Sequence, residues 1–145
     1  MNSYYFCFVM TIDDVVYDKT YLTIYHKAEE QLIHLQWKGY ASSEQFRDGL
    51  NAALEVVIEH DIQNWLGNLK LMQVILSSDE EWAGKEWYPL IAKTKLKQMA
   101  IVTSLDYFNN TVVKRIVEKS EPLINFETRY FVDLNEAYDW LTKKA

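Results

Sequence analysis

The chain has 145 residues, a common size for one domain, and its 49% hydrophobic and 14% aromatic content excludes wholesale disorder. Its 15 basic and 21 acidic residues give a net charge of −6, which disfavours binding to nucleic acid or to anionic membranes. Cys7 is the only cysteine, so no disulfide can form within the chain and a reducing, cytoplasmic location is expected. No apolar run reaches the length of a membrane span, and the apolar start of the chain lacks the basic residues of a signal peptide.

The sequence divides into a leader, residues 1–20, and one domain, residues 21–145. The leader contains an apolar stretch, residues 4–11, for which two interpretations remain open. It forms an extra edge strand, or it is disordered, as chain termini often are. Glycine and proline are scarce, which leaves little room for a linker to a second domain.

The domain begins with a predicted β-hairpin. Residues 21–26 and 31–37 have the composition of strands, and the four polar-rich residues between them form a break of hairpin length. A register that places Ile24 opposite Ile33 buries the apolar side of both strands, which favours that register.

A long helix follows the hairpin. Ser42 and Gln45 have the spacing of a capping box, and the apolar residues beyond them repeat at helical spacing, so we expect a helix that ends near His60. Residues 64–69 have the pattern of a buried strand. Residues 70–76 are apolar but belong to no clear element.

A second helix is predicted to begin at Ser77 or Ser78. Either serine can act as the N-cap, with Glu80 or Glu81 as its reciprocal partner. The acidic residues in the first turn also suit the positive end of the helix dipole. Pro89 lies inside this helix or restarts it, so a kink is expected there.

The remaining chain alternates between short strands and helices. Residues 98–103 and 126–132 have the pattern of strands, residues 109–119 form a helix, and Asp133 caps a terminal helix. The order β-β-α-β-α-β-α-β-α predicts an α/β fold. Its mixed sheet has four to six strands and about four helices, and its later strands run parallel through right-handed crossovers.

The sequence contains no recognisable catalytic, metal or coenzyme motif. His26, His34 and His60 lack helical i, i+4 spacing, and no second cysteine is present, so no metal site is predicted. The four glycines lie too far apart for a dinucleotide fingerprint or a phosphate loop. Ser77 and Ser78 have no base nearby in the sequence, so no catalytic residue is assigned. We expect neither a cofactor nor enzymatic activity, although a perturbed carboxylate in a deep pocket would indicate an enzyme.

An aromatic cluster in the second helix comprises Trp82, Trp87 and Tyr88. Regular helical geometry does not allow Trp87 and Tyr88 both to face the same core. Two interpretations remain open: the rings cover the sheet edge, or they form an interface or line an apolar pocket.

Short segments follow one another in a characteristic order through residues 21–141. They are LQWKGYASSEQF (35–46), NWLGNLK (64–70), SSDEEW (77–82), WYP (87–89), KQMAIV (97–102) and RYFVDLNEAYDWL (129–141). Together they resemble the STAS-like families related to the bacterial anti-sigma-factor antagonist SpoIIAA. The resemblance implies a SpoIIAA-like two-layer α/β sandwich that acts by binding, as a regulatory partner of kinases and anti-sigma factors or as a module on transporters.

The resemblance also implies a place for regulation. In the phospho-regulated members, the switch is a serine at the start of the helix after the third core strand, and Ser77 and Ser78 fall near that place. The family's Asp-Ser-Ser-Gly pattern is missing, because Leu76 precedes the serines and Asp79 follows them. The acidic residues there would repel a phosphate. Some relatives of the broader STAS and SEC14 type have been associated with lipid or nucleotide ligands.

Two functions remain open at this point. The chain is a non-enzymatic regulatory or protein-binding domain of a bacterial cytoplasmic protein, or it is a carrier or sensor of a small apolar ligand such as a lipid. In the second case Trp82, Trp87 and Tyr88 lie near the pocket. Exposed strand edges of the hairpin or the leader offer a surface for a homodimer.

Overall fold

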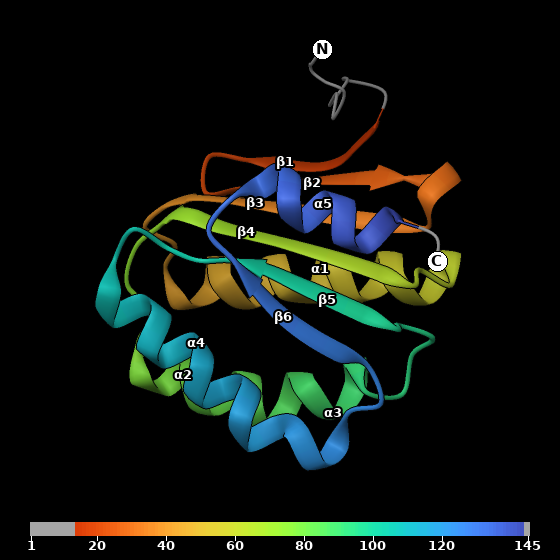
Figure 1. Cartoon of the computed structure of the whole chain (residues 1–145). Helices are drawn as coiled ribbons and strands as arrows, with labels where there is room; N and C mark the ends of the chain where they lie inside the picture. The colour runs from red at the N-terminus through yellow and green to blue at the C-terminus, as the bar shows by residue number, and fades with distance from the viewer. Residues whose placement is uncertain (1–13, 144–145) are drawn as a thin grey trace.

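The computed structural model describes residues 14–143. In this range one sheet has six strands in the order β1-β2-β3-β4-β5-β6 (Figure 1). The strands are β1 (Val15–Lys19), β2 (Leu22–Lys27), β3 (Leu32–Gly39), β4 (Asn64–Met72), β5 (Gln98–Val102) and β6 (Glu127–Phe131). The strands β1 to β3 pair antiparallel and β3 to β6 pair parallel, which confirms the predicted mixed sheet.

The helices lie on both faces of this sheet. They are α1 (Ser43–His60), α2 (Ser77–Trp82), α3 (Tyr88–Ile91), α4 (Tyr107–Ser120) and α5 (Leu134–Thr142), and a π-helical turn, η3 (Ala83–Trp87), joins α2 to α3. Figure 1 shows α1 to α4 on one face and α5 on the other. No helix within residues 14–143 combines the length and the hydropathy needed to cross a membrane.

Two apolar clusters separate along the two-residue period of the strands. On β3, the side chains of Ile33, Leu35 and Trp37 join the larger cluster beneath α1, η3, α3 and α4. Leu32 faces the other way and joins a smaller cluster with Ala137 and other residues beneath α5. The larger cluster contains the candidate site.

The predicted hairpin register is wrong by two residues. Ile24 pairs with Leu35 and His26 pairs with Ile33. The reason lies in the connection, which is a 3₁₀ turn over Ala28–Glu30 followed by Gln31 in the left-handed region at φ 50°. The connection has four residues in both registers, but it covers residues 28–31 where the prediction placed it at residues 27–30, so β2 continues through Lys27 and pairs with Leu32. A shift of two residues preserves the faces of the strands, so the apolar side stays buried.

Two elements are longer than predicted. The strand β4 continues through Met72, where it pairs with Gly39 of β3, so part of the segment 70–76 is a strand extension. The helix α4 begins at Tyr107, because Asp106 accepts hydrogen bonds from the first backbone amides and acts as the N-cap. Within the leader, residues 15–19 form β1, whereas residues 4–11 lie outside the described residues.

The helix-capping predictions have different outcomes. Ser42 and Gln45 form the predicted reciprocal capping box, and Asp133 caps α5 as expected. The N-cap prediction for the second helix is wrong, since Leu76 occupies that position and no side chain caps α2. Pro89 follows the π turn within one continuous run of helical residues, 77–91, so of the two predicted alternatives the proline lies inside the helix.

Candidate apolar ligand site

A cavity of about 80 Å³ lies between the sheet and the helices α1, α3 and α4. Its wall contains Trp37 of β3, Trp65 of β4 and Met99 of β5 on the sheet side, and Trp87 and Tyr88 on the helix side. A void of this size in a protein core costs about 2 kcal/mol at about 24 cal/mol per Å³. A bound apolar group would offset that cost.

Trp87 and Tyr88 both point into the core, which corrects the expectation that adjacent helical residues cannot do so. Their side chains are only 2% and 5% exposed. The backbone amide of Tyr88 donates to the carbonyl of Ala83 across five residues, as in a π-helix. The wider π turn changes the angular spacing of neighbouring side chains, so two consecutive rings reach the same cavity.

The polar atoms of these two rings are already used. Trp87 Nε1 donates to the carbonyl oxygen of Leu50 at 3.0 Å, and Tyr88 Oη donates to Met99 Sδ at 3.5 Å. Burial raises the pKa of Tyr88 above its ordinary value, so the phenol stays neutral at physiological pH. The cavity wall therefore offers an apolar surface, and these two groups have no hydrogen-bond donor to spare for a ligand.

Trp82 occupies a different place, because it does not line the cavity. Its ring is half-buried, packs edge-on against Phe46 at 6.3 Å between centroids, and lies under the guanidinium of Arg47 at 5.3 Å. Trp82 thus covers the junction of α1 and α2. The structure brings Trp87 and Tyr88 together and separates Trp82 from them.

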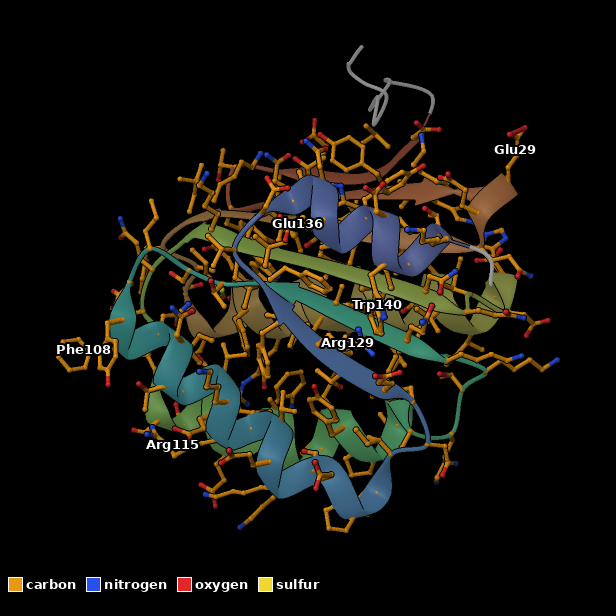
Figure 2. The ribbon with its side chains drawn as sticks, in the orientation of Figure 1. Glu29, Phe108, Arg115, Arg129, Glu136 and Trp140 are labelled. Atoms are coloured by element: carbon orange, nitrogen blue, oxygen red, sulfur yellow. The ribbon has the colours of Figure 1, made fainter. Side chains whose placement is uncertain are left out.

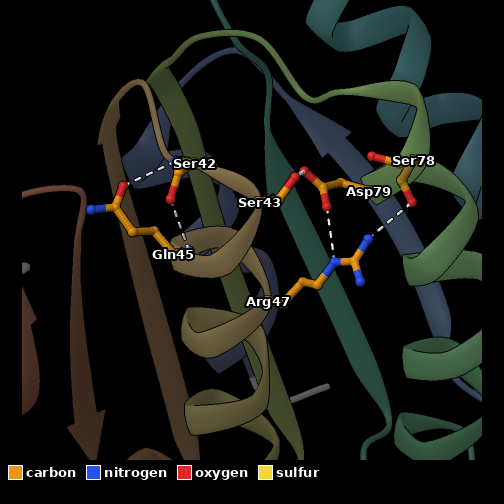
Figure 3. A network of polar contacts seen from close by, with 6 residues as sticks. All are labelled: Ser42, Ser43, Gln45, Arg47, Ser78 and Asp79. Carbon is orange, nitrogen blue, oxygen red and sulfur yellow. Dashed lines mark hydrogen bonds and ion pairs between the residues drawn. The ribbon is translucent and has the colours of Figure 1, made fainter.

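A polar network holds the start of α2 to the start of α1 (Figure 3). The carboxylate of Asp79 is only 2% exposed and accepts from Arg47 Nε at 2.9 Å and from Ser43 Oγ at 2.8 Å. Arg47 also donates to the carbonyl oxygen of Ser78 at 3.4 Å. Such charge-assisted hydrogen bonds stabilise the position of α2, which leads directly into the η3 segment of the cavity wall. Sequence analysis did not predict this contact, since Asp79 resembles an ordinary acidic residue in the first turn of a helix.

Ser77 and Ser78 are both exposed in the first turn of α2. Neither hydroxyl caps the helix, and the neighbouring carboxylate of Asp79 faces α1. Both hydroxyls are accessible from solvent, as a modification site requires. Phosphorylation of either serine stays a prediction.

A second contact links α2 to α4. Arg115 donates to Glu80 through Nε at 2.8 Å and through a terminal nitrogen at 3.0 Å, which gives a two-pronged pair. The hydrogen bonds from Arg115 hold the pKa of Glu80 below its ordinary value, against a smaller opposing effect of burial. Arg115 is exposed on α4 (Figure 2), so the pair adds little stability on its own.

An exposed apolar patch lies at the start of α4. It consists of Leu105, Tyr107 and Phe108, which are 76%, 76% and 77% exposed. Phe108 projects away from the body of the protein in Figure 2. Sequence analysis missed this patch, because these residues directly precede the predicted helix and resemble its apolar positions.

Comparison with known proteins identifies the fold. The family model described as SpoIIAA-like matches residues 32–142. No curated protein matches the sequence. A crystal structure of an uncharacterized protein from the DUF3478 family with a SpoIIAA-like fold, from Shewanella loihica PV-4, aligns with a TM-score of 0.54 and 15% identity. The alignment covers 83% of this chain and 91% of that one, and at this identity it shows the fold alone. Together with the mixed sheet and its crossovers, the match over most of the chain shows that this protein belongs to the SpoIIAA-like family.

Proposed function

We propose that this protein binds a small apolar molecule, or the apolar end of a larger one, in the cavity beneath η3 and α4. The observation that carries this proposal is the cavity itself, whose wall is aromatic and aliphatic while its Trp87 and Tyr88 donors are already used. Ligand sites are typically concave, mostly apolar and preformed. Family membership supports binding as the mode of action, because the SpoIIAA resemblance implies no chemistry of its own.

The size of the cavity limits the ligand. A space of about 80 Å³ accepts only a few carbon atoms, so a longer molecule has to extend past the cavity wall. Each buried methylene contributes about 0.8 kcal/mol. Two or three of them give a contribution that a binding measurement can detect.

Blocking the cavity tests the proposal. Val113 of α4 lines it, and Val113→Phe places a ring in the space. We expect this variant to bind 1-octanol about tenfold more weakly, because it displaces two or more buried methylenes. Trp37, Trp65 and Trp87 in the wall report binding by their fluorescence, and native mass spectrometry of freshly purified protein shows any bound cellular ligand.

The matched control is Val112→Phe, which adds the same bulk to the same helix. Val112 is half-buried and does not line the cavity, so this variant should bind 1-octanol like the original protein. Equal binding by both variants would show that the probe binds elsewhere on the protein.

A second function, protein binding in a regulatory domain of a cytoplasmic bacterial protein, is supported by the apolar patch of Leu105, Tyr107 and Phe108. Contiguous exposed hydrophobic residues often mark interaction surfaces. The patch lies outside the cavity wall, so both functions are compatible in one protein.

Replacing two patch residues tests this second function. Tyr107→Ser with Phe108→Ser should change the free energy of unfolding by about 0.5 kcal/mol or less, because both side chains are exposed. The double variant should lose a partner that co-purifies in fixed stoichiometry from the native host. Leu123→Ser, at another exposed apolar position, should keep that partner. A partner retained by all variants would place the interface elsewhere. If the double variant has half the particle mass of the original protein in solution, the partner is a second copy of this chain.

A further inference from the structure

The cavity offers little to recognise a polar group on a ligand. Trp87 Nε1 and Tyr88 Oη, which lie in its wall, already donate to Leu50 and Met99. A ligand that carries a polar or charged group gains most by placing that group outside the cavity, because burying a polar group without a partner is unfavourable. The surface beside the cavity therefore decides which class of molecule fits.

Two surface clefts adjoin the cavity, one on each side of α4. The first, named here the seam cleft, lies between α2–η3 and α4, has a volume of about 540 Å³ and shares Ile116 with the cavity wall. The second, named the β6 cleft, lies between α4 and β6, has a volume of about 570 Å³ and shares Val117 with the cavity wall. Each cleft thus shares one lining residue with the cavity, Ile116 for the seam cleft and Val117 for the β6 cleft.

The charges of the two clefts differ. The β6 cleft contains Glu118, Glu121 and Glu127 against Lys114, so it repels an anion. The seam cleft contains two carboxylates and two ammonium groups among its lining residues. The seam cleft is therefore the better place for a negatively charged group.

One cation of the seam cleft is left over when its ion pairs are assigned. Glu81 accepts from Lys85 at 2.7 Å, and Glu80 is held by Arg115 from the rim. Lys119, in the last turn of α4, has no ion pair of its own among the described residues. Ser77 adds an exposed hydroxyl at the same cleft. An anionic group placed there would gain a cation and a hydrogen-bond donor.

We propose that the ligand is an amphiphile whose anionic head, a carboxylate or a phosphate, lies in the seam cleft beside Lys119 while its chain passes Ile116 into the cavity. This inference rests on the proposed function, because it extends the apolar site to the surface. Gly84 lines the seam cleft, and a Cβ added there would meet no atom within 4 Å, so no side chain closes the cleft at this position.

Three probes with the same eight-carbon chain test the proposal: octanoate, 1-octanol and octylammonium. We expect octanoate to bind about two- to fivefold more tightly than 1-octanol, since a partly exposed ion pair contributes modestly, and octylammonium to bind most weakly. The preference should shrink at high salt. Tryptophan fluorescence and calorimetry give the dissociation constants.

Two lysine variants locate the head of the ligand. Lys119→Gln should bind octanoate and 1-octanol equally, whereas Lys114→Gln, on the β6 side of the same helix, should keep the preference for octanoate. Gly84→Leu should weaken both probes, because its Cβ meets no atom within 4 Å and the rest of its side chain would occupy the cleft that Gly84 lines. Loss of the preference in Lys114→Gln alone would place the head in the β6 cleft and overturn the proposal.

The remaining outcomes separate this inference from the proposed function. If 1-octanol binds in the cavity and octanoate binds no better, the headgroup site is wrong and the apolar site stands. If no probe binds, the apolar site itself is wrong. If Gly84→Leu binds both probes unchanged, the chain does not pass through the seam cleft, and the inference fails.

Discussion

Replacing Trp87 by alanine is expected to lower the free energy of unfolding by about 3–5 kcal/mol, the usual cost of truncating a large buried aromatic residue. Trp87 is almost fully buried and packs edge-on against Trp65 at 5.4 Å and Tyr88 at 5.2 Å between ring centroids. Its removal would also delete the hydrogen bond to Leu50 and enlarge the existing cavity. Urea unfolding monitored by far-ultraviolet circular dichroism measures the change.

Trp82→Ala is the matched control, because it removes the same side chain from the same helical segment. Trp82 is half-buried and lies outside the cavity, so its truncation should cost clearly less than that of Trp87. Indole should restore part of the lost stability to Trp87→Ala alone, since a ligand that binds only the folded state stabilises it by mass action. If both variants lose the same free energy of unfolding and indole stabilises neither, the removal of Trp87 does not create a space that a ligand can enter.

Local patterns predicted the architecture well. The capping box of Ser42 and Gln45 and the cap at Asp133 depend on residues three apart, so the sequence alone contains the information. The parallel crossovers were predicted from the order of strands and helices, which the sequence pattern also contains. The predicted hairpin register was wrong because the turn that ends with Gln31 in the left-handed region lies one residue later than expected, and glutamine gives no signal for that conformation.

The candidate site depends on contacts that local patterns do not contain. Arg47 and Asp79 meet across 32 positions of sequence, and neither residue differs from an ordinary exposed helical charge when it is considered alone. The π turn before Tyr88 has no simple residue signature, so the inward direction of both Trp87 and Tyr88 could not be predicted. The aromatic cluster indicated the region of the site, and the fold decided which of its rings face the cavity.

The opposite face of the sheet gives the second large effect, a loss of stability in acid caused by His34. This side chain lies in β3, is almost fully buried and packs against the ring of Tyr25 at 5.3 Å between centroids. Burial, with a smaller effect of the nearby Lys27 charge, lowers the pKa of His34 to about 3 from its ordinary 6.5. The folded protein therefore binds fewer protons at this site than the unfolded chain does.

The sign of the effect follows from this difference. Well above about pH 6.5 the imidazole of His34 is neutral in both the folded and the unfolded state, so His34 contributes no pH dependence to the free energy of unfolding there. As the pH falls below that value, the unfolded chain takes up the proton and the folded protein does not, so stability falls by up to about 1.4 kcal/mol per pH unit until the folded pKa near 3. Urea unfolding at a series of pH values between about 7 and 4 measures the slope.

His34→Leu replaces the titrating group by an apolar side chain. The unfolding free energy of this variant should therefore depend less on pH in this window. His26→Gln is the comparison. Partial burial, with the neighbouring His60, also lowers the pKa of His26, but its ring is half-exposed and its contribution should be smaller. Carboxylates that titrate in the same range are common to all three proteins, so differences between the slopes isolate the histidines. Parallel slopes for the original protein and His34→Leu would mean that the folded protein accepts the proton on His34 without penalty.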